Sequence, residues 1–293
     1  VCDWTTYSST HEMLDHRLTD FGITTTFVDT ADIESVKSAI QENTRLIYFE
    51  TIANPTMKVA DMAALVEAAQ HHEILTVCDN TFASPCVIRP LDWGVDLVVE
   101  SATKFISGHS DVIGGAICMK SKVLPVDFLE QIRWDTMVKW GSPLAPFNAW
   151  LLLRSLQTLS VRVERQCQSA MKLANHFAQH EKVNRVWYPG LASHAQHALA
   201  KMQMPTFGGM LSFDVGNADK ALKVLDGLRL ACFAASLGGV RTTTQIPASM
   251  AFLDISEDER RQMGISDGMI RVSVGIEDID DLIEDFDRAL ALV

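Results

Sequence analysis

Apolar residues in the first half of the chain fall into short continuous runs, which are separated by stretches with helical spacing. The stretches with helical spacing predict helices at 31–43 and 61–72. The continuous runs predict buried strands at 44–50, 74–79, 95–104 and 114–119. Because strands and helices alternate in this way, we expect βαβ units and an α/β fold with a mostly parallel sheet.

The second half follows a loop at Pro143–Pro146 and has a pattern of its own. It predicts a long helix at 147–180, strands at 210–215 and 269–274, and helices at 219–228 and 279–292. The 293 residues exceed the usual size of one hydrophobic core. We therefore expect two domains, a large one at 1–154 and a smaller C-terminal α/β domain at 155–293.

Composition narrows the class of protein. The chain is 47% hydrophobic and 21% charged, as ordinary globular proteins are. Its net charge of −12 argues against nucleic acid and anionic membranes as partners. No apolar run reaches the roughly 18 residues needed to span a bilayer. The six cysteines are scattered without a C-x-x-C pair, which favours a reduced, cytoplasmic protein.

Two of the predicted strands lead into ionisable side chains. The run from Val95 continues into Lys104, and the preceding run ends at Asp79. If these strands are parallel neighbours, the amine and the acid lie at the same sheet edge, where open α/β folds bind ligands. A buried lysine loses its proton more readily and can attack a carbonyl. The alternatives are a lysine that points into water and an aspartate that caps a helix or turn.

An amine beside a carboxylate suits pyridoxal 5′-phosphate (PLP), which needs an amine for its aldehyde and an anion at its pyridine nitrogen. Further motifs follow in a recognisable order. They are Ala53-Asn54-Pro55-Thr56, Asp79-Asn80-Thr81-Phe82, Ser101-Ala102-Thr103-Lys104, Gly108-His109-Ser110-Asp111, Ser236-Leu237-Gly238-Gly239, Pro247-Ala248-Ser249-Met250 and the run from Arg271 to Asp278. With these motifs the chain resembles, over essentially its whole length, the PLP-dependent enzymes of cysteine and methionine metabolism.

That family includes cystathionine γ-lyase, methionine γ-lyase and cystathionine γ-synthase, and the resemblance implies its fold, the type I PLP-dependent transferase fold of aspartate aminotransferase. It also implies a role for each matching residue. Lys104 would form a Schiff base with the cofactor and shuttle protons, while Tyr7 would stack on the ring and serve as an acid or base. The other contacts would come from Asp79 at the pyridine nitrogen, Ser101 and Thr103 at the phosphate, Asn54 near the 3-hydroxyl group, and Arg271 with Ser236 at the substrate carboxylate.

The activity implied by the resemblance is that of a carbon–sulfur lyase in transsulfuration, which acts on a sulfur-containing amino acid by α,γ-elimination. The alternative is a γ-replacement transferase of the cystathionine γ-synthase or O-acylhomoserine sulfhydrylase type. Relatives form homotetramers, as dimers of dimers with shared active sites. They also extend further at the N-terminus, where a Tyr-x-Arg motif and a Ser-Gly-Met-type turn bind the phosphate. A second alternative is therefore a non-catalytic fragment. On sequence alone, Tyr7 could instead pack at a surface, and Arg271 could pair with Glu277 or Asp278.

Three positions leave the substrate open. Arg241 stands where the cystathionine enzymes usually carry a glutamate, and Ser9 stands where methionine γ-lyases often have a cysteine. Phe252 replaces a histidine that is common in the family. The resemblance therefore implies a sulfur amino acid or an acylated homoserine without choosing among them.

Two further motifs point to other chemistry. Gly264-Ile265-Ser266-Asp267-Gly268 fits the G-x-S-x-G elbow of serine hydrolases, which needs a strand before it and a helix after it. His71-His72 and His109-x-Asp111 invite a metal ion, but adjacent histidines at a helix end point apart. We expect neither a hydrolase nor a resident metal.

Overall fold

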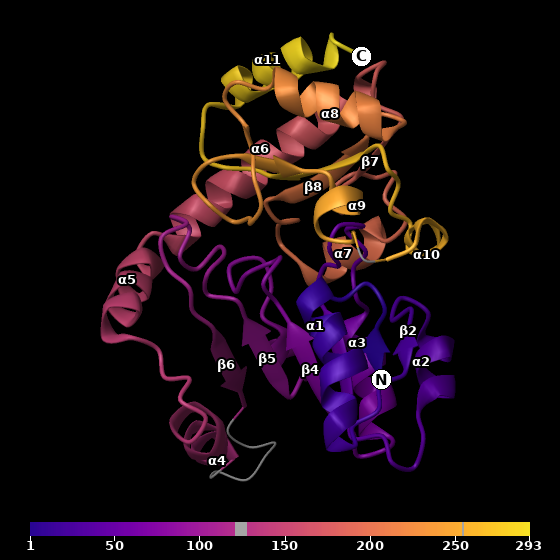
Figure 1. Ribbon diagram of the computed structural model, residues 1–293, viewed down its shortest axis with the longest axis vertical. Coiled ribbons are helices and arrows are strands. Elements are labelled where there is room, and N and C mark those ends of the chain that lie inside the picture. The colour runs from indigo at the N-terminus through magenta and orange to yellow at the C-terminus, as the bar shows by residue number, and fades with distance from the viewer. Residues whose placement is uncertain (121–127, 254) are drawn as a thin grey trace.

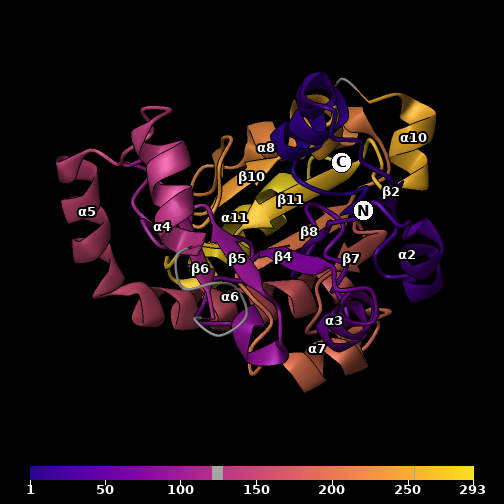
Figure 2. The same ribbon diagram turned by 90° about the horizontal axis from the view of Figure 1, so that it is seen from below.

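The computed structural model describes residues 1–120, 128–253 and 255–293. It contains two sheets, and Figure 1 shows them in the lower and upper halves of the molecule. The helix α6 (Leu159–Gln179) runs diagonally from one half to the other (Figure 1). In Figure 1 one edge of the first sheet faces the second sheet, and Figure 2 shows the same molecule from below.

The first sheet has the strand order β2-β1-β3-β4-β5-β6 and is parallel except for β6, which pairs antiparallel with β5. Its strands are β1 (Cys2–Asp3), β2 (Phe27–Val28), β3 (Leu46–Glu50), β4 (Leu75–Asp79), β5 (Leu97–Glu100) and β6 (Ala116–Met119). The helices of this half are α1 (Ser8–Glu12), α2 (Ile33–Ala39), α3 (Met62–Gln70), α4 (Phe128–Ile132) and α5 (Pro146–Leu156). The predicted α/β fold with a mostly parallel sheet is confirmed.

The second sheet has the order β7-β8-β11-β10-β9, and all its pairings except β9 with β10 are antiparallel. Its strands are β7 (Arg185–Trp187), β8 (Met210–Asp214), β9 (Cys232–Phe233), β10 (Thr243–Gln245) and β11 (Met269–Ser273). Its helices, besides α6, are α7 (His197–Gln203), α8 (Ala218–Gly227), α9 (Pro247–Met250), α10 (Glu257–Gln262) and α11 (Ile279–Leu290). Helix α11 contacts both α6 and α8 in the upper half of Figure 1.

Side-chain caps explain where several predicted helices begin. Asp32 accepts a hydrogen bond from Glu34 N at the start of α2, and Asp61 accepts one from Ala64 N at the start of α3. Asn217 caps α8 in the same way. These short polar residues satisfy backbone N–H groups that have no partner within the helix. The starts of these helices are therefore readable in the sequence.

The predicted helix at 147–180 is wrong in one respect, because it is two helices. Thr158 leaves helical geometry, with φ −113° and ψ 3°, and separates α5 from α6. Its hydroxyl donates to Ser155 O at 3.2 Å instead of continuing the helical pattern. Neither glycine nor proline marks this break, so the apolar pattern alone predicts one continuous helix.

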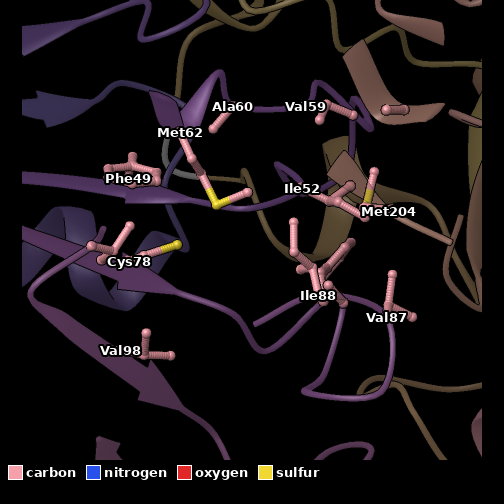
Figure 3. Packing of buried hydrophobic residues seen from close by; sticks show 14 of the residues in the cluster. Phe49, Ile52, Val59, Ala60, Met62, Cys78, Val87, Ile88, Val98 and Met204 are labelled. Atoms are coloured by element: carbon pink, nitrogen blue, oxygen red, sulfur yellow. The ribbon is translucent and has the colours of Figure 1, made fainter. Parts of the chain in front are cut away.

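A hydrophobic core lies on the first sheet and draws residues from both halves of the chain (Figure 3). Phe49 of β3 and Cys78 of β4 are fully buried there, and Met204, which follows α7, packs into the same cluster. Burial of one such large apolar side chain stabilises the fold by about 1.5–3 kcal/mol. The two halves therefore share packing, and the proposed division at residue 154 stays a prediction.

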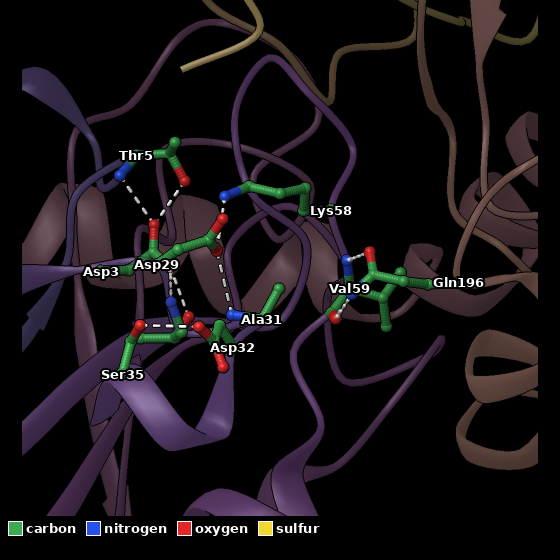
Figure 4. A network of polar contacts seen from close by, with 10 residues as sticks. Asp3, Thr5, Asp29, Ala31, Asp32, Ser35, Lys58, Val59 and Gln196 are labelled. Atoms are coloured by element: carbon green, nitrogen blue, oxygen red, sulfur yellow. Dashed lines mark hydrogen bonds and ion pairs between the residues drawn. The ribbon is translucent and has the colours of Figure 1, made fainter. Parts of the chain in front are cut away.

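Polar contacts fix the start of the chain and join the halves (Figure 4). The buried carboxylate of Asp3 accepts hydrogen bonds from Thr5 N at 2.7 Å and Thr30 N at 3.0 Å. Further along, Gln196 bonds both the N–H and the carbonyl of Val59, at 2.8 and 2.6 Å. Because Asp3 ends β1, these contacts direct the chain towards α1 at the sheet edge. None of the described helices is long and apolar enough to cross a membrane.

Candidate functional site

A cavity of about 460 Å³ opens at the carboxyl edge of the first sheet. Its walls come from β3, β4 and the turns that follow them, and from β10 and β11 of the second sheet. All eight residues to which the resemblance gives a role at the cofactor or substrate line it: Tyr7, Asn54, Asp79, Ser101, Thr103, Lys104, Ser236 and Arg271. The fold thus brings together side chains that are far apart along the chain.

Lys104 lies in a turn rather than at the end of a strand. The prediction that a strand continues to Lys104 is wrong, because β5 ends at Glu100 and the backbone then turns, with Lys104 N donating to Ser101 O at 3.0 Å. The Lys104 ammonium donates to Ser236 Oγ at 3.0 Å. Burial lowers the pKa of Lys104, and the positive charge of Arg271 lowers it further. The amine therefore loses its proton more readily than an exposed lysine.

Asp79 ends β4, which pairs in parallel with β5 as predicted. Its carboxylate accepts hydrogen bonds from Thr81 N at 2.9 Å and from the Tyr48 hydroxyl at 3.3 Å. Burial raises the pKa of Asp79, and the hydrogen bonds from Thr81 and Tyr48 oppose that rise. A cationic group in the cavity would stabilise this buried carboxylate in its charged form.

Arg271 is buried in β11, with 4% of its surface exposed. Its guanidinium donates to Asn54 Oδ1 at 3.1 Å, to Ser236 O at 2.9 Å and to Gln245 Oε1 at 2.8 Å, and its Nε has no partner. None of the described ion pairs includes Arg271, whereas Glu277 accepts from Thr242 and Asp278 accepts from Asp280 N. Burial lowers the pKa of Arg271 to about 10. Its charge remains uncompensated by these partners, as is typical of a site for an anionic ligand.

The two predicted phosphate-binding hydroxyls differ in their availability. Thr103 Oγ1 donates to Gly114 O at 3.2 Å and accepts from Gly114 N at 3.1 Å, so its proton is already engaged. Within the part of the chain that the structure describes, Ser101 Oγ makes no hydrogen bond, although the Ser101 backbone N–H donates to Thr81 Oγ1 at 2.8 Å. Among the described residues that line the cavity, Lys104 and Arg271 are the cations. Because the resemblance assigns Lys104 to the Schiff base and Arg271 to the substrate carboxylate, a phosphate here would be bound by neutral donors.

Tyr7 and Asn54 are linked through a residue that sequence reasoning missed. Glu50 is buried at the end of β3, next to Asp79 in register, and also lines the cavity. It accepts hydrogen bonds from Tyr7 N at 2.7 Å and from Asn54 N at 3.3 Å. Burial raises the pKa of Glu50 well above its usual value, and the charge of Asp79 adds to this. Glu50 could have been found from the sequence, because it is an acid at the end of an apolar run, as Asp79 is. Gln245 was also missed, and no local pattern marks it.

The three positions that left the substrate open lie outside this cavity. Arg241 is exposed and donates to Cys232 Sγ at 2.9 Å. Ser9 and Phe252 line a neighbouring groove of about 650 Å³, which shares Ser8 with the cavity. The charge of Arg241 therefore does not bear directly on a ligand in the cavity.

The motif that suggested a hydrolase has the order of its flanking elements reversed. Ser266 lies between α10 and β11, so a helix precedes it and a strand follows it, the reverse of a hydrolase elbow. Its hydroxyl donates to Asp214. Within residues 1–120, 128–253 and 255–293, no group of three or more histidine, cysteine or acidic side chains could hold a metal ion.

Residues 1–291 match the family described as Cys/Met metabolism PLP-dependent enzyme, and the chain belongs to that family. Among its relatives, an L-methionine gamma-lyase of Fusobacterium nucleatum is 41% identical over 99% of this chain and 73% of that protein. A cystathionine beta-lyase of Coxiella burnetii is 44% identical over 92% of this chain and 69% of that protein. The family and these relatives show that the chain is a member of a class of PLP-dependent carbon–sulfur lyases.

A solved structure shows the same fold. The putative O-acetylhomoserine (thiol)-lyase of Campylobacter jejuni superimposes with a TM-score of 0.96 at 33% identity, over 99% of this chain and 76% of that one. Its description includes a pyridoxyl-lysine phosphate. The predicted type I PLP-dependent fold and the predicted cofactor are thereby confirmed for this family.

The residues of the cavity fit PLP in kind. An amine with a lowered pKa, a buried carboxylate and a buried guanidinium with a free Nε are all present. These groups suit an aldehyde, a pyridine nitrogen and an amino-acid carboxylate, respectively. The phosphate would have the weakest binding groups, the neutral hydroxyls of Ser101 and Thr103.

Proposed function

We propose that this chain removes the sulfur substituent from the γ-carbon of an amino acid, with consumption of one water molecule and release of a thiol, ammonia and an α-keto acid. Arg271 carries the proposal, because it is a buried guanidinium whose hydrogen bonds go only to neutral oxygens and it lines the same cavity as Lys104. A free α-carboxylate is the ligand that such a fork binds in a bidentate pair. The names of the relatives support a sulfur amino acid as the substrate class.

Each cavity residue has a proposed task. PLP, when bound, supplies an electron sink that makes the α-proton of the substrate acidic. Lys104 takes and returns the proton at the α-carbon, since its lowered pKa favours the free amine. Asp79 would hold the ring nitrogen of the cofactor, and Arg271 with Ser236 would bind the substrate carboxylate. Asn54 orients Arg271 and would help to hold the cofactor, and Tyr7, which is half-exposed and lines the cavity, would protonate the departing sulfur.

The role of Lys104 has a direct test. The variant Lys104→Ala should lose the visible absorbance of lysine-bound PLP and all measurable lyase activity, because no other described lysine lines the cavity. Borohydride reduction followed by peptide mass spectrometry should find the pyridoxyl group on Lys104 in the parent protein. Lys172→Ala, an exposed position on α6, is the matched control and should behave as the parent does. A parent protein that stays colourless with excess PLP would instead support the non-catalytic fragment.

Replacement in place of elimination is the second candidate, and the likeness to the putative O-acetylhomoserine (thiol)-lyase favours it. The two reactions differ in what they need. Elimination converts the amino acid and water into a thiol, ammonia and an α-keto acid without a second thiol, whereas replacement yields a new thioether only when a thiol is added. Product analysis with methionine, cystathionine and an acylated homoserine, each with and without a thiol, separates them.

We also propose that the chain forms a homotetramer in the cytoplasm. Large apolar side chains are exposed on and near α5, among them Trp140, Phe147 and Trp150, which supports a contact with a second copy. The described cysteines are all free, as is usual in a reducing compartment. Cell fractionation tests the location, and the assembly is treated in the Discussion.

A further inference from the structure

The turn that carries Lys104 depends on contacts from outside its own sheet. Residues 101–108 follow β5 as a series of tight turns, and Gly108 N donates to Lys104 O at 2.7 Å. The carbonyls of Phe105 and Ile106, which directly follow Lys104, accept no backbone hydrogen bond within the described part of the chain. Buried carbonyls of this kind need a partner, since an unsatisfied one destabilises the fold.

Arg162 of α6 is that partner. Its Nη1 donates to Phe105 O at 2.8 Å and its Nη2 to Ile106 O at 3.1 Å. The same guanidinium donates to Ser155 O at 3.1 Å, and its Nε donates to Thr158 Oγ1 at 3.1 Å. Arg162 is 5% exposed, and none of the described ion pairs includes it. The planar guanidinium therefore binds backbone carbonyls rather than a carboxylate. A lysine ammonium cannot reproduce this geometry.

Gln166, four residues later on the same face of α6, holds the second turn. Gln166 Nε2 donates to Gly239 O at 2.8 Å, and the Gln166 side chain is fully buried. Gly239 closes the turn that begins at Ser236, the residue that meets Lys104 Nζ. The two turns also contact each other directly, because Val240 N donates to Gly108 O at 2.9 Å.

We propose that Arg162 is a positioning residue for Lys104, and that α6, through Arg162 and Gln166, fixes Lys104 against Ser236. The inference rests on the proposed role of Lys104 as the reactive amine. Arg162 does not line the cavity, so it acts through the backbone that follows Lys104. A helix of 21 residues is a rigid support for both turns. A displacement of about 1 Å in a reacting group costs roughly 100-fold in rate.

The test combines substitution with chemical rescue. In the holoenzyme, Arg162→Ala should lower kcat about 100-fold and change KM only a few-fold, because the substrate carboxylate still meets Arg271. Added guanidinium should restore part of kcat, whereas urea at the same concentration should not. Arg162→Lys should stay well below the parent, since one ammonium cannot reach both carbonyls. Arg154→Ala, an exposed arginine on α5, is the matched control and should leave kcat unchanged.

Hydrogen exchange gives a second measurement that does not depend on turnover. Amides of residues 104–108 should exchange faster in Arg162→Ala than in Arg154→Ala, while those of β8 should be unaffected. The inference is overturned if kcat and amide exchange in Arg162→Ala match those of the parent. It is also overturned if the loss of kcat is proportional to the unfolded fraction and added guanidinium does not restore kcat. Should the alanine variant not fold, a parental kcat in Arg162→Lys overturns it equally.

Failure of the proposed function gives a different result. If borohydride reduction of the parent leaves Lys104 unmodified, then Lys104 is not the cofactor lysine, and the proposed lyase falls. Faster exchange of residues 104–108 in Arg162→Ala would even then show that Arg162 fixes this turn, while exchange equal to that of Arg154→Ala would refute the inference as well.

Discussion

The acids at the carboxyl edge of the first sheet are buried side by side with little countercharge. Glu50, Asp79 and Glu100 end three neighbouring strands, and burial is the main cause that raises the pKa of each. Like charges so close together cannot all ionise without cost. A pyridine nitrogen that carries a proton would offset part of this repulsion at Asp79, so cofactor binding and carboxyl ionisation should be linked.

Glu100 lies on this edge but not in the cavity, which makes it a test of the electrostatics alone. Burial, and secondarily the charge of Asp79, raises the pKa of Glu100 from 4.5 to about 7, while a hydrogen bond from Asn80 opposes the rise. Between these two pH values the folded protein binds more protons than the unfolded chain. The free energy of unfolding should therefore fall as the pH rises through this range.

The variant Glu100→Gln removes the titration and keeps an oxygen that accepts from Asn80. Urea unfolding between about pH 5 and pH 8 should show the parent losing on the order of 1–3 kcal/mol relative to this variant. Glu181→Gln, at an exposed position, should keep the parental dependence on pH. Equal slopes for the parent and Glu100→Gln would show that Glu100 ionises normally in the fold.

At the scale of elements, the contact between two turns decides the geometry of Lys104. Gly238 has φ +77°, and a Cβ atom there would lie 2.5 Å from Phe105 N and 2.9 Å from Lys104 C. These neighbours are backbone atoms that cannot rotate away. Gly238 N also donates to Ser273 Oγ at 2.7 Å, which ties the turn to β11.

We therefore expect Gly238→Ala to destabilise the fold by about 1–3 kcal/mol more than a glycine substitution of similar conformation in open space. Gly22→Ala provides that comparison, because Gly22 has φ +75° with nothing within 4 Å of the added Cβ. Thermal unfolding of both variants measures the difference. The pH dependence of the absorbance of lysine-bound PLP, which reports protonation of the nitrogen that joins Lys104 to PLP, should change only in Gly238→Ala. A similar loss of stability in both variants would mean that the turns can separate without cost.

The elements that the sequence predicted are those with a strong local signal. The strand β4 and the helix α3 follow from an apolar run and from helical spacing with an aspartate cap. The short strands β9 and β10 were not predicted, because two or three residues carry no periodicity. The sequence placed Lys104 at the end of a strand, whereas Lys104 lies in the turn after β5, because no local pattern distinguishes strand from turn after Glu100.

The location of the site could be predicted from the sequence, whereas the contacts between its side chains could not. An acid and a lysine after neighbouring strands indicated one sheet edge, and that edge does form the cavity. The contacts of Arg271 with Asn54 and Gln245 depend on how the second sheet packs on the first, which no local pattern specifies. Arg162 was missed for the same reason, because its partners are 56 and 57 residues away.

At the scale of the whole molecule, α6 belongs to both hydrophobic cores. Leu159 and Val163 near its start pack with the first sheet, whereas Leu173 and Phe177 pack with the second. Motion of one half relative to the other would therefore have to bend α6 or break one of these contacts. The cavity between the sheets is already formed in this structure, with lining residues from both of them.

One face of the molecule leaves large apolar side chains in solvent. Trp140, Phe147 and Trp150 are 78%, 66% and 55% exposed, and Leu153 of α5 is 65% exposed. They lie on the side of the molecule where Figure 1 shows α4, α5 and β6. Phe147 and Trp150 contact each other, with ring centroids 5.8 Å apart. Single exposed apolar residues are ordinary, but exposed aromatic residues in contact with each other are typical of an interface. Burial of this face against a second copy of the chain is the simplest way to remove it from water.

The double variant Phe147→Glu, Trp150→Glu should therefore reduce the mass of the assembly. Light scattering after gel filtration should give the parent a multiple of 32.4 kDa. Loss of two aromatic anchors and the addition of like charges should raise the dissociation constant at least about 100-fold, so the variant should elute as a smaller species at micromolar concentration. Leu222→Glu, an exposed apolar position on α8, controls for the added charge and should keep the parental mass. A monomeric parent, or a double variant of unchanged mass, would show that this face is not where copies meet.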